Sequence, residues 1–240
     1  MHPYKMIPTQ ELTEDDFDRR TYFCERMMDM LDNNIIQLED VMFSDECTFS
    51  LNGHANRQNC RYWSTENPYW MREVHTQYPQ KVNVWAGIVR NHVIGPFFIE
   101  GNLNGDNYLA LLQNDIIPAL ANLFPHPGNP QLPANTIWFQ QDRAPPYYQP
   151  NVRQYLDTIF PNRWIGRRGS IEWPARSPDL SSLDFFLCGY VQRNVYKTKP
   201  IDLNDLKERI TLAIRSITPD ILNNVRREFY SSEHFEHLLH

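Results

Sequence analysis

The sequence predicts one α/β domain in which antiparallel strands come first and strands flanked by helices follow. Short runs of β-branched and aromatic residues at 41–51, 81–101 and 136–142 are typical of strands. Apolar residues recur at helical spacing in 105–123 and 201–217, which indicates amphipathic helices. With 240 residues, 41% of them hydrophobic and 22% charged, the chain is long and apolar enough to bury a core.

The first part of the chain is expected to form a helical lead-in followed by strands. Tyr22, Phe23 and Met27 lie at helical spacing within residues 1–38, which predicts a linker-like helix there. The Asn, Gly and polar content of 52–59 predicts a turn and loop. The strands expected around that loop are 41–46, 47–51, 81–89 and 93–101, the last two as a hairpin.

The later part is expected to alternate helices with two strands. Pro118 predicts a kink or break in the helix at 105–123, and 126–133 is a proline-rich connection. A buried strand at 136–142 should end on Asp142. The remaining expected elements are a helix at 149–160, a short strand at 171–173, and helices at 183–196, 201–217 and 219–229.

Charge and cysteine usage exclude several classes of protein. With 23 Lys and Arg against 29 Asp and Glu the net charge is −6, which disfavours a simple charge-driven coat on nucleic acid. Neither a signal peptide nor an apolar run of membrane-spanning length is visible, so no membrane partner is expected. No C-x-x-C pair occurs among Cys24, Cys47, Cys60 and Cys188, so we expect reduced thiols, as in an intracellular protein.

Three aspartates stand where an α/β sheet collects ligands. Asp45 and Asp142 end apolar strands, and Asp184 opens an apolar helix. If the first and fourth strands lie side by side, Asp45 and Asp142 become neighbours, and a helix across the sheet could add Asp184. Gathered carboxylates require compensating positive charge, which a pair of Mg²⁺ or Mn²⁺ ions would supply. The alternative is that each aspartate only caps a turn or a helix.

Several blocks of sequence resemble the mariner-like DDE/D transposases, in particular an insect branch of these transposable elements. The signature blocks are FSDECTF (43–49), QQDRAPPYY (140–148) and WPARSPDLSSLDFFLCGY (173–190), and NPYW, VNVWAGIV, RWIGRRG and VYKTKP are similar as well. The resemblance implies an RNase H-like fold, with a mixed five-stranded sheet flanked by helices. It also implies that Asp45, Asp142 and Asp184 are the catalytic, metal-binding triad and that Asp179 is a structural acid.

The resemblance carries expectations about activity and organisation. It implies DNA strand cleavage and transfer with two Mg²⁺ or Mn²⁺ ions per site, transposon ends as the DNA partner, a homodimer and a nuclear location. The catalytic domain is expected at 39–230, after the lead-in at 1–38 and before a tail at 231–240. Family members carry helix-turn-helix modules before the catalytic domain, and we expect this chain to lack them, as an N-terminally truncated form.

Two residues beside the second aspartate depart from the family pattern. The family has a small or neutral residue after that aspartate and a histidine four places further on, where this chain has Arg143 and Tyr147. Arg143 could pair with Asp142 and compete with a metal ion, or it could point away toward phosphate or solvent. Tyr147 lacks an imidazole but could still form a hydrogen bond. Both residues are therefore candidate inactivating changes.

The densest basic cluster follows the fourth strand. Arginines and lysines near an acidic centre can hold phosphates, and an interleaved Trp164 could stack on a base or belong to the core. The candidate nucleic-acid-binding residues are Arg163, Arg167, Arg168, Arg176, Lys197 and Lys199.

Three functions remain open from the sequence alone. The first is an active transposase catalytic domain, and the second is a non-catalytic, transposon-derived module that binds nucleic acid or another protein. A glycoside hydrolase with two carboxylates is the third, but it leaves the third aspartate without a role.

Overall fold

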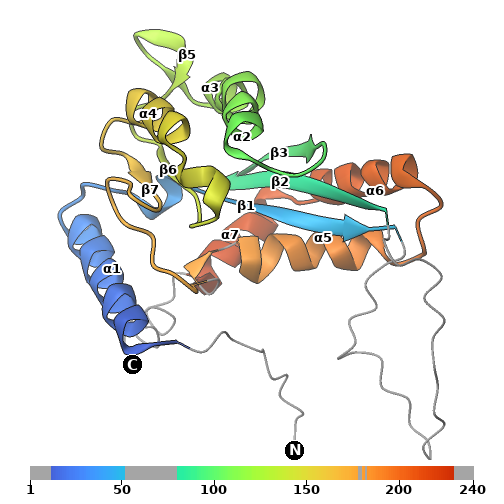
Figure 1. Ribbon diagram of the computed structural model, residues 1–240, viewed down its shortest axis with the longest axis horizontal. Helices are drawn as coiled ribbons and strands as arrows, with labels where there is room; N and C mark the ends of the chain where they lie inside the picture. Colours follow the sequence, from blue (N-terminus) through green and yellow to red (C-terminus); the bar gives the residue numbers. More distant parts are fainter. Residues whose placement is uncertain (1–11, 52–79, 178–179, 182, 230–240) are drawn as a thin grey trace, which may run out of the picture.

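A mixed five-stranded sheet forms the centre of the molecule (Figure 1). The computed structural model describes residues 12–51, 80–177, 180–181 and 183–229, without the side chains of residues 184, 185, 228 and 229. The strand order is β3-β2-β1-β6-β7. The strands are β1 (Val41–Ser50), β2 (Lys81–Val89), β3 (His92–Ile99), β6 (Trp138–Gln140) and β7 (Trp164–Ile165).

The first three strands form an antiparallel meander, and the last two run parallel to β1. β1 pairs antiparallel with β2, and β2 pairs antiparallel with β3. β6 pairs parallel with both β1 and β7. The mixed five-stranded sheet that the sequence predicts is therefore confirmed, and so is the hairpin of β2 and β3.

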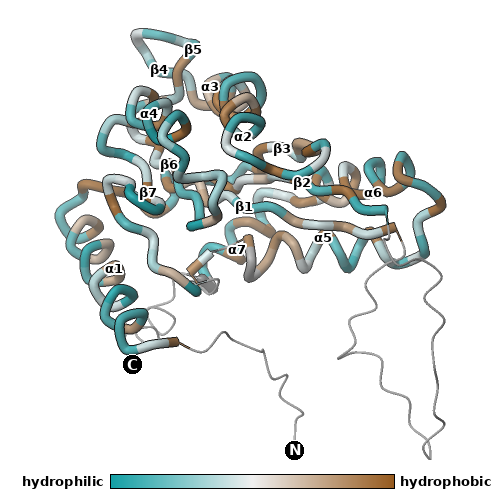
Figure 2. The backbone as a smooth tube through the Cα atoms, viewed as in Figure 1, coloured by the Kyte–Doolittle hydropathy of each residue, from teal (hydrophilic) through white to brown (hydrophobic). Residues whose placement is uncertain are grey.

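Helices cover both faces of this sheet (Figure 1). Figure 2 shows hydrophobic and hydrophilic stretches alternating along α1 and α6, as expected for helices with one buried face. Among the described residues, no helix is long and apolar enough to span a bilayer. On one face lie α1 (Glu14–Asp32), η5 (Leu183–Leu187), α5 (Cys188–Val195), α6 (Leu203–Arg215) and α7 (Pro219–Phe229), and on the other α2 (Gly105–Leu111), η2 (Leu112–Ile116), α3 (Ile117–Leu123) and α4 (Pro150–Ile159).

Each face of the sheet has its own hydrophobic core, because side chains alternate along β1. Phe43 and Phe49 of β1 belong to the core beneath α5 and α6. Met42 lies on the other face with Trp85 and Phe139, in the core beneath α2, α3 and α4. Short 3₁₀ segments, η1 (Leu38–Asp40) and η3 (Pro145–Tyr148), precede β1 and α4.

Three elements differ from the sequence-based expectation, and a fourth is not tested. The two strands expected at 41–46 and 47–51 are one strand, because no turn residue interrupts their alternation. The connection at 126–133 contains a small hairpin of β4 (Pro125–His126) and β5 (Asn129–Pro133). The last strand of the sheet is β7, whereas 171–173 contributes an isolated bridge from Ile171 to Ile165. The expected loop at 52–59 lies outside the described residues.

Near Pro118, where a kink or break is expected, the structure has a π-helical segment that ends two residues before the proline. The helix of 105–123 continues as α2, η2 and α3, and η2 is a π-helical segment that ends just before α3. Pro118 then occupies the first turn of α3, where a missing backbone N–H costs little.

Candidate active site

Asp45 and Asp142 lie at the same level of two neighbouring parallel strands. Met42 of β1 pairs with Phe139 of β6, and each aspartate follows its paired residue by three positions, 45 − 42 and 142 − 139. Neighbouring strands are about 4.8 Å apart, so the two carboxylates come to one region of the sheet. The prediction that the first and fourth strands lie side by side is confirmed. Asp45 is not at the end of its strand, since β1 continues to Ser50 against β2.

Local hydrogen bonds fix both carboxylates. The Ala144 backbone N–H donates to Asp142 Oδ1 over 2.8 Å, which closes a turn directly after β6. Burial raises the pKa of Asp142, and the bond from Ala144 partly opposes that rise. Asp45 Oδ1 accepts a hydrogen bond from the Glu46 backbone N–H over 2.7 Å. Asp142 is therefore a desolvated acid whose charge would be favoured by a cation.

Asp184 lies in η5, a π-helical turn that packs on the same face of β1 as Phe43. Leu183 and Leu187 of this turn are buried in that core. π-Helical turns inside helices are frequent at functional sites. The side chain of Asp184 is outside the described part of the structure, so its membership of the triad stays a prediction.

A disulfide between Cys47 and Cys188 ties together the elements that carry two of the three aspartates. Their Cα atoms are 5.9 Å apart. Cys47 follows Asp45 by two residues, and Cys188 follows Asp184 by four residues. The bond therefore anchors the start of α5 to the face of β1 on which Phe43 lies.

The prediction that the thiols stay reduced is wrong for Cys47 and Cys188. They are 141 residues apart in sequence, and only the packing of α5 on β1 brings them into bonding range. Cys24 is buried, and Cys60 lies outside the described residues.

Helix α1 holds the beginning of the third signature block, residues 173–177. Arg20 Nη1 donates to Ser177 Oγ over 2.8 Å, and both side chains are buried. The Phe23 ring meets Trp173 edge-on, with centroids 5.2 Å apart. The predicted lead-in helix is thus packed onto the 173–177 segment. Asp179, the expected structural acid, lies outside the described residues.

Glu46 is an acidic residue of the site that the sequence did not single out. It pairs with Trp85 of β2, on the face of the sheet opposite Phe43. Burial, followed by the charges of Asp45 and Asp142, raises its pKa well above the usual range. Its Oε1 is buried and has no partner among the described residues. The signal in the sequence is the second acid of FSDE, which strand alternation turns to the other face.

Arg143 does not pair with Asp142 in the structure. Its Nη1 donates to Glu172 Oε1 over 3.0 Å and to the Trp173 carbonyl over 3.1 Å. Of the two orientations that the sequence left open, the structure has the one that points away from the aspartate. Glu172 neutralises the guanidinium, so Arg143 has a structural partner outside the triad.

Tyr147, at the position of the family histidine, belongs to the core. It is 2% exposed, and its ring centroid is 4.5 Å from that of Tyr108. Its hydroxyl is buried without a partner among the described residues. Gln141 Nε2 donates to the Tyr147 carbonyl over 2.9 Å, which fixes η3 against the end of β6.

The structure separates Arg163 from the rest of the basic cluster. Arg163 precedes β7, and its Nη1 donates over 2.6 Å to the carbonyl of Ile137, which precedes β6. Arg167 and Arg168 follow β7 and so lie toward the opposite edge, the one that Asp142 occupies. Trp164 is buried and donates to Asp157, so it is a core residue.

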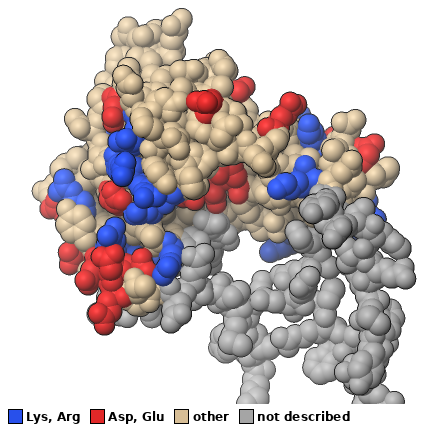
Figure 3. All heavy atoms as spheres, in the orientation of Figure 1, with Lys and Arg blue, Asp and Glu red and all other residues tan. Residues whose placement is uncertain are grey.

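The other predicted phosphate contacts differ in their surroundings. The Arg167 guanidinium lies 3.9 Å above the Tyr148 ring, and Arg176 pairs with Asp16 over 3.0 Å. Lys197 and Lys199 are exposed beyond the end of α5. Figure 3 shows Lys and Arg side chains gathered around β7 and the loops that follow it, with an acidic group toward the middle of the same face.

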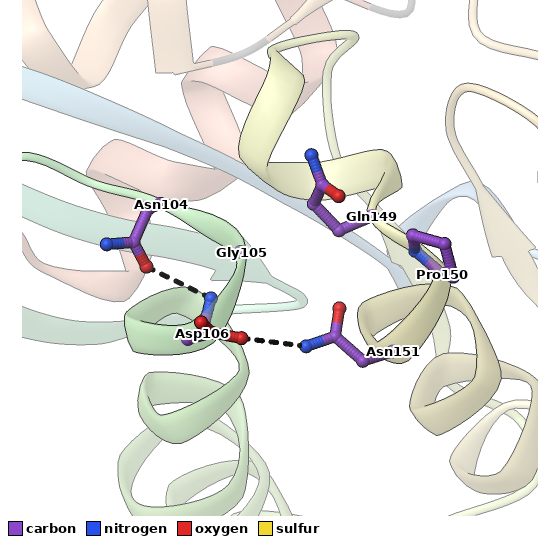
Figure 4. Close-up of a pocket in the computed structure, with 6 residues that line it drawn as sticks. All are labelled: Asn104, Gly105, Asp106, Gln149, Pro150 and Asn151. Atoms are coloured by element: carbon purple, nitrogen blue, oxygen red, sulfur yellow. Dashed lines mark hydrogen bonds between the residues drawn. The ribbon is translucent and has the colours of Figure 1, made fainter.

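A shallow pocket lies where α2 and α4 begin (Figure 4). Asn104 Oδ1 accepts from the Asp106 backbone N–H over 3.0 Å, and Asn151 Nδ2 donates to Asp106 Oδ1 over 3.1 Å. These bonds cap α2 and join the starts of the two helices. The polar side chains of the pocket therefore have a structural role at this point. Its lining residues are Asn104, Gly105, Asp106, Gln149, Pro150 and Asn151.

Comparison with known proteins gives one similar curated sequence. The Tc3 transposase of Caenorhabditis elegans is 27% identical over 198 residues, which cover 78% of this chain and 52% of that protein. The chain thus spans about half the length of this relative. No protein-family model matches the chain.

Solved structures of Mos1 transposase share the fold. The catalytic domain of Mos1 mariner transposase superposes with a TM-score of 0.69 at 17% identity, covering 97% of this chain and 96% of that one. A pre-cleavage Mos1 transpososome gives a TM-score of 0.78 at 17% identity, covering 100% of this chain and 66% of the other. The RNase H-like fold class is therefore confirmed.

Proposed function

We propose that this chain, which in sequence and fold resembles the catalytic domain of mariner-like transposases, cleaves and joins DNA strands with the help of divalent metal ions. The observation that carries the proposal is the register of β1 and β6, which sets Asp45 and Asp142 at one level. The packing of η5 on β1 brings the backbone of Asp184 to the same side as Phe43. We propose that the Asp184 carboxylate joins those of Asp45 and Asp142 at one reaction centre.

The side chains present fit a hard divalent cation. Burial desolvates Asp142 and raises its pKa, so a bound cation would favour its charged form. Carboxylate oxygens are the donors that Mg²⁺ and Mn²⁺ prefer. Among the described side chains no three acids, histidines or cysteines gather for a metal, and Asp184 would complete the set. Mos1 catalytic-domain structures with Mn and with Mg support the choice of ion.

In this proposal the carboxylates of Asp45, Asp142 and Asp184 would hold two divalent ions. The metals would activate the attacking water or 3′-hydroxyl and stabilise the leaving oxygen. The chain's own contribution is to fix the carboxylates on a rigid sheet, since Ala144 and Gln141 hold the turn after β6.

DNA is the proposed partner, as transposon ends. A Mos1 transposase complex with a left transposon end supports this choice. Arg167 and Arg168 follow β7 at the edge where Asp142 lies, so they are the candidates for contacts to phosphates. A homodimer and a nuclear location belong to the same proposal.

The proposal predicts Mn²⁺-dependent nicking of supercoiled DNA. Asp45→Ala, Asp142→Ala and Asp184→Ala should each lower the nicking rate at least roughly 1,000-fold, because each removes a ligand of the catalytic ions. The measurement is conversion of supercoiled to open-circular plasmid on a gel. Asp115→Ala, which changes an exposed acid of η2, is the control and should retain the activity.

The second candidate is a non-catalytic module that binds nucleic acid or a protein. It is favoured by Tyr147, which is buried in the core where the family has a histidine. If the wild type binds DNA but nicks it no faster than the three alanine variants, this candidate holds. The Arg143–Glu172 ion pair counts against this second candidate, because Arg143 pairs with Glu172 and does not compete with a metal ion for Asp142.

A further inference from the structure

Two buried glutamines directly precede Asp142. Gln140 and Gln141 are each 1% exposed. A buried amide is costly unless its polar atoms are bonded, so the partners of each glutamine indicate what it holds in place.

Gln140 links β6 to β1 just before the two aspartates. The backbone ladder between these strands pairs Val41 with Trp138 and Met42 with Phe139. One residue further along the strands, hydrogen bonds between side chains and backbone connect β1 and β6. The Ser44 backbone N–H donates to Gln140 Oε1 over 3.1 Å, and Ser44 Oγ donates to the Gln140 carbonyl over 2.6 Å.

Ser44 immediately precedes Asp45, and Gln140 lies two residues before Asp142. These two hydrogen bonds, both donated by Ser44 to Gln140, therefore join the strands one residue before Asp45 and two residues before Asp142. Ser44 is 4% exposed, so water does not compete for these bonds.

Gln141 fixes the other side of Asp142. Its Oε1 accepts from the Tyr108 hydroxyl, and its Nε2 donates to the Tyr147 carbonyl, each over 2.9 Å. Its backbone N–H donates to the Ile165 carbonyl over 3.0 Å. Gln141 thereby anchors the end of β6 to α2, β7 and η3. The contact from this end of β6 to β1 is made by Gln140.

We propose that Gln140 is a positioning residue, which acts through Ser44 to set the separation of Asp45 and Asp142 so that one divalent ion can bind both carboxylates. The inference rests on the proposed function. Without the Gln140 amide, both carboxylates and the paired part of the ladder remain, but the strands beyond Met42 and Phe139 lose a link. Metal affinity should then fall in a protein that is still folded.

The test is calorimetric titration of the whole chain with Mn²⁺, at a temperature where circular dichroism shows each variant to be folded. Gln140→Met keeps the length of the side chain and removes the acceptor for Ser44. Loss of an outer-shell partner typically costs about 10–100-fold in metal affinity, and we expect a weakening in that range. Ser44→Thr keeps the hydroxyl and should stay close to wild type, whereas Ser44→Ala should weaken binding.

The matched control lies on the same strand. Thr48 Oγ1 donates to Asn83 Oδ1 over 2.9 Å across β1 and β2, at an exposed position away from β6. Thr48→Val removes this bond and should leave Mn²⁺ affinity unchanged. If Gln140→Met lowers the melting temperature but binds Mn²⁺ as tightly as wild type, Gln140 is only structural and the inference is overturned. If the wild type itself binds no Mn²⁺, the proposed function fails and takes the inference with it.

Discussion

Glu46 gives the folded chain a pH-dependent cost in stability. Its pKa in the fold is well above the ordinary value of 4.5, chiefly through burial and then through the charges of Asp45 and Asp142. Above pH 4.5 the folded state therefore binds more protons than the unfolded state, and the free energy of unfolding falls as the pH rises toward the folded pKa. Asp142, with its pKa raised, acts in the same direction.

Glu46→Gln should therefore stabilise the chain at pH 8 and have little effect near pH 4. The gain should be roughly 1.4 kcal/mol for each unit by which the fold raises the pKa. Urea unfolding in the presence of EDTA at several pH values measures it. Glu100→Gln, at an exposed position, is the control. A gain for Glu46→Gln that does not grow with pH would contradict the explanation.

The sequence predicts single residues well where a motif fixes them and poorly where a partner comes from a distant loop. Strand β1, which contains Asp45, and strand β6, which precedes Asp142, are neighbours as expected, because short apolar runs identify both strands. The pairing of Arg143 with Glu172 could not be predicted, since a segment of irregular structure brings the two residues together across 29 positions.

Among the elements, the junction of β1 and α5 depends on the disulfide. A disulfide that closes a long loop typically contributes about 2–4 kcal/mol by restricting the unfolded chain. Reduction with dithiothreitol, or the change Cys47→Ala, should therefore lower the melting temperature by roughly 5–15 °C for a chain of this size. Differential scanning fluorimetry measures the shift.

The double variant Cys47→Ala, Cys188→Ala provides the control for reduction. It should melt at the lower temperature and show no further change with dithiothreitol. An equal response of wild type and double variant to dithiothreitol would show that the effect has another source.

Long elements with a strong local signal were predictable, and short ones were not. α6 begins after Asp202, whose side chain accepts from the Asp205 backbone N–H, so a cap and an apolar stripe both identified it. β7 has only two residues, and β6 and Ile171 give it its partners, which a local pattern cannot contain.

At the scale of the whole molecule, positive side chains gather on one part of the surface although the net charge is negative. The chain carries a net charge of −6, yet basic side chains gather around β7 and the loops after it (Figure 3). Part of the negative charge belongs to Asp45, Glu46 and Asp142. The charges of the two aspartates raise the pKa of Glu46, so these carboxyl groups interact electrostatically. Composition alone therefore disfavours DNA as a substrate, whereas the arrangement in the fold allows it.

The distribution predicts weak, salt-sensitive DNA binding that depends on Arg167 and Arg168. Each phosphate contact contributes a slope of about −0.9 to the dependence of log K on log salt, so Arg167→Ala, Arg168→Ala should flatten the slope by about 2. Fluorescence anisotropy with a labelled duplex at several salt concentrations measures it. The double variant Arg215→Ala, Arg227→Ala removes the same charge from exposed positions on α6 and α7 and should leave the slope unchanged. Equal slopes for both double variants would show that binding follows net charge, and that the basic group after β7 is not the contact surface for DNA.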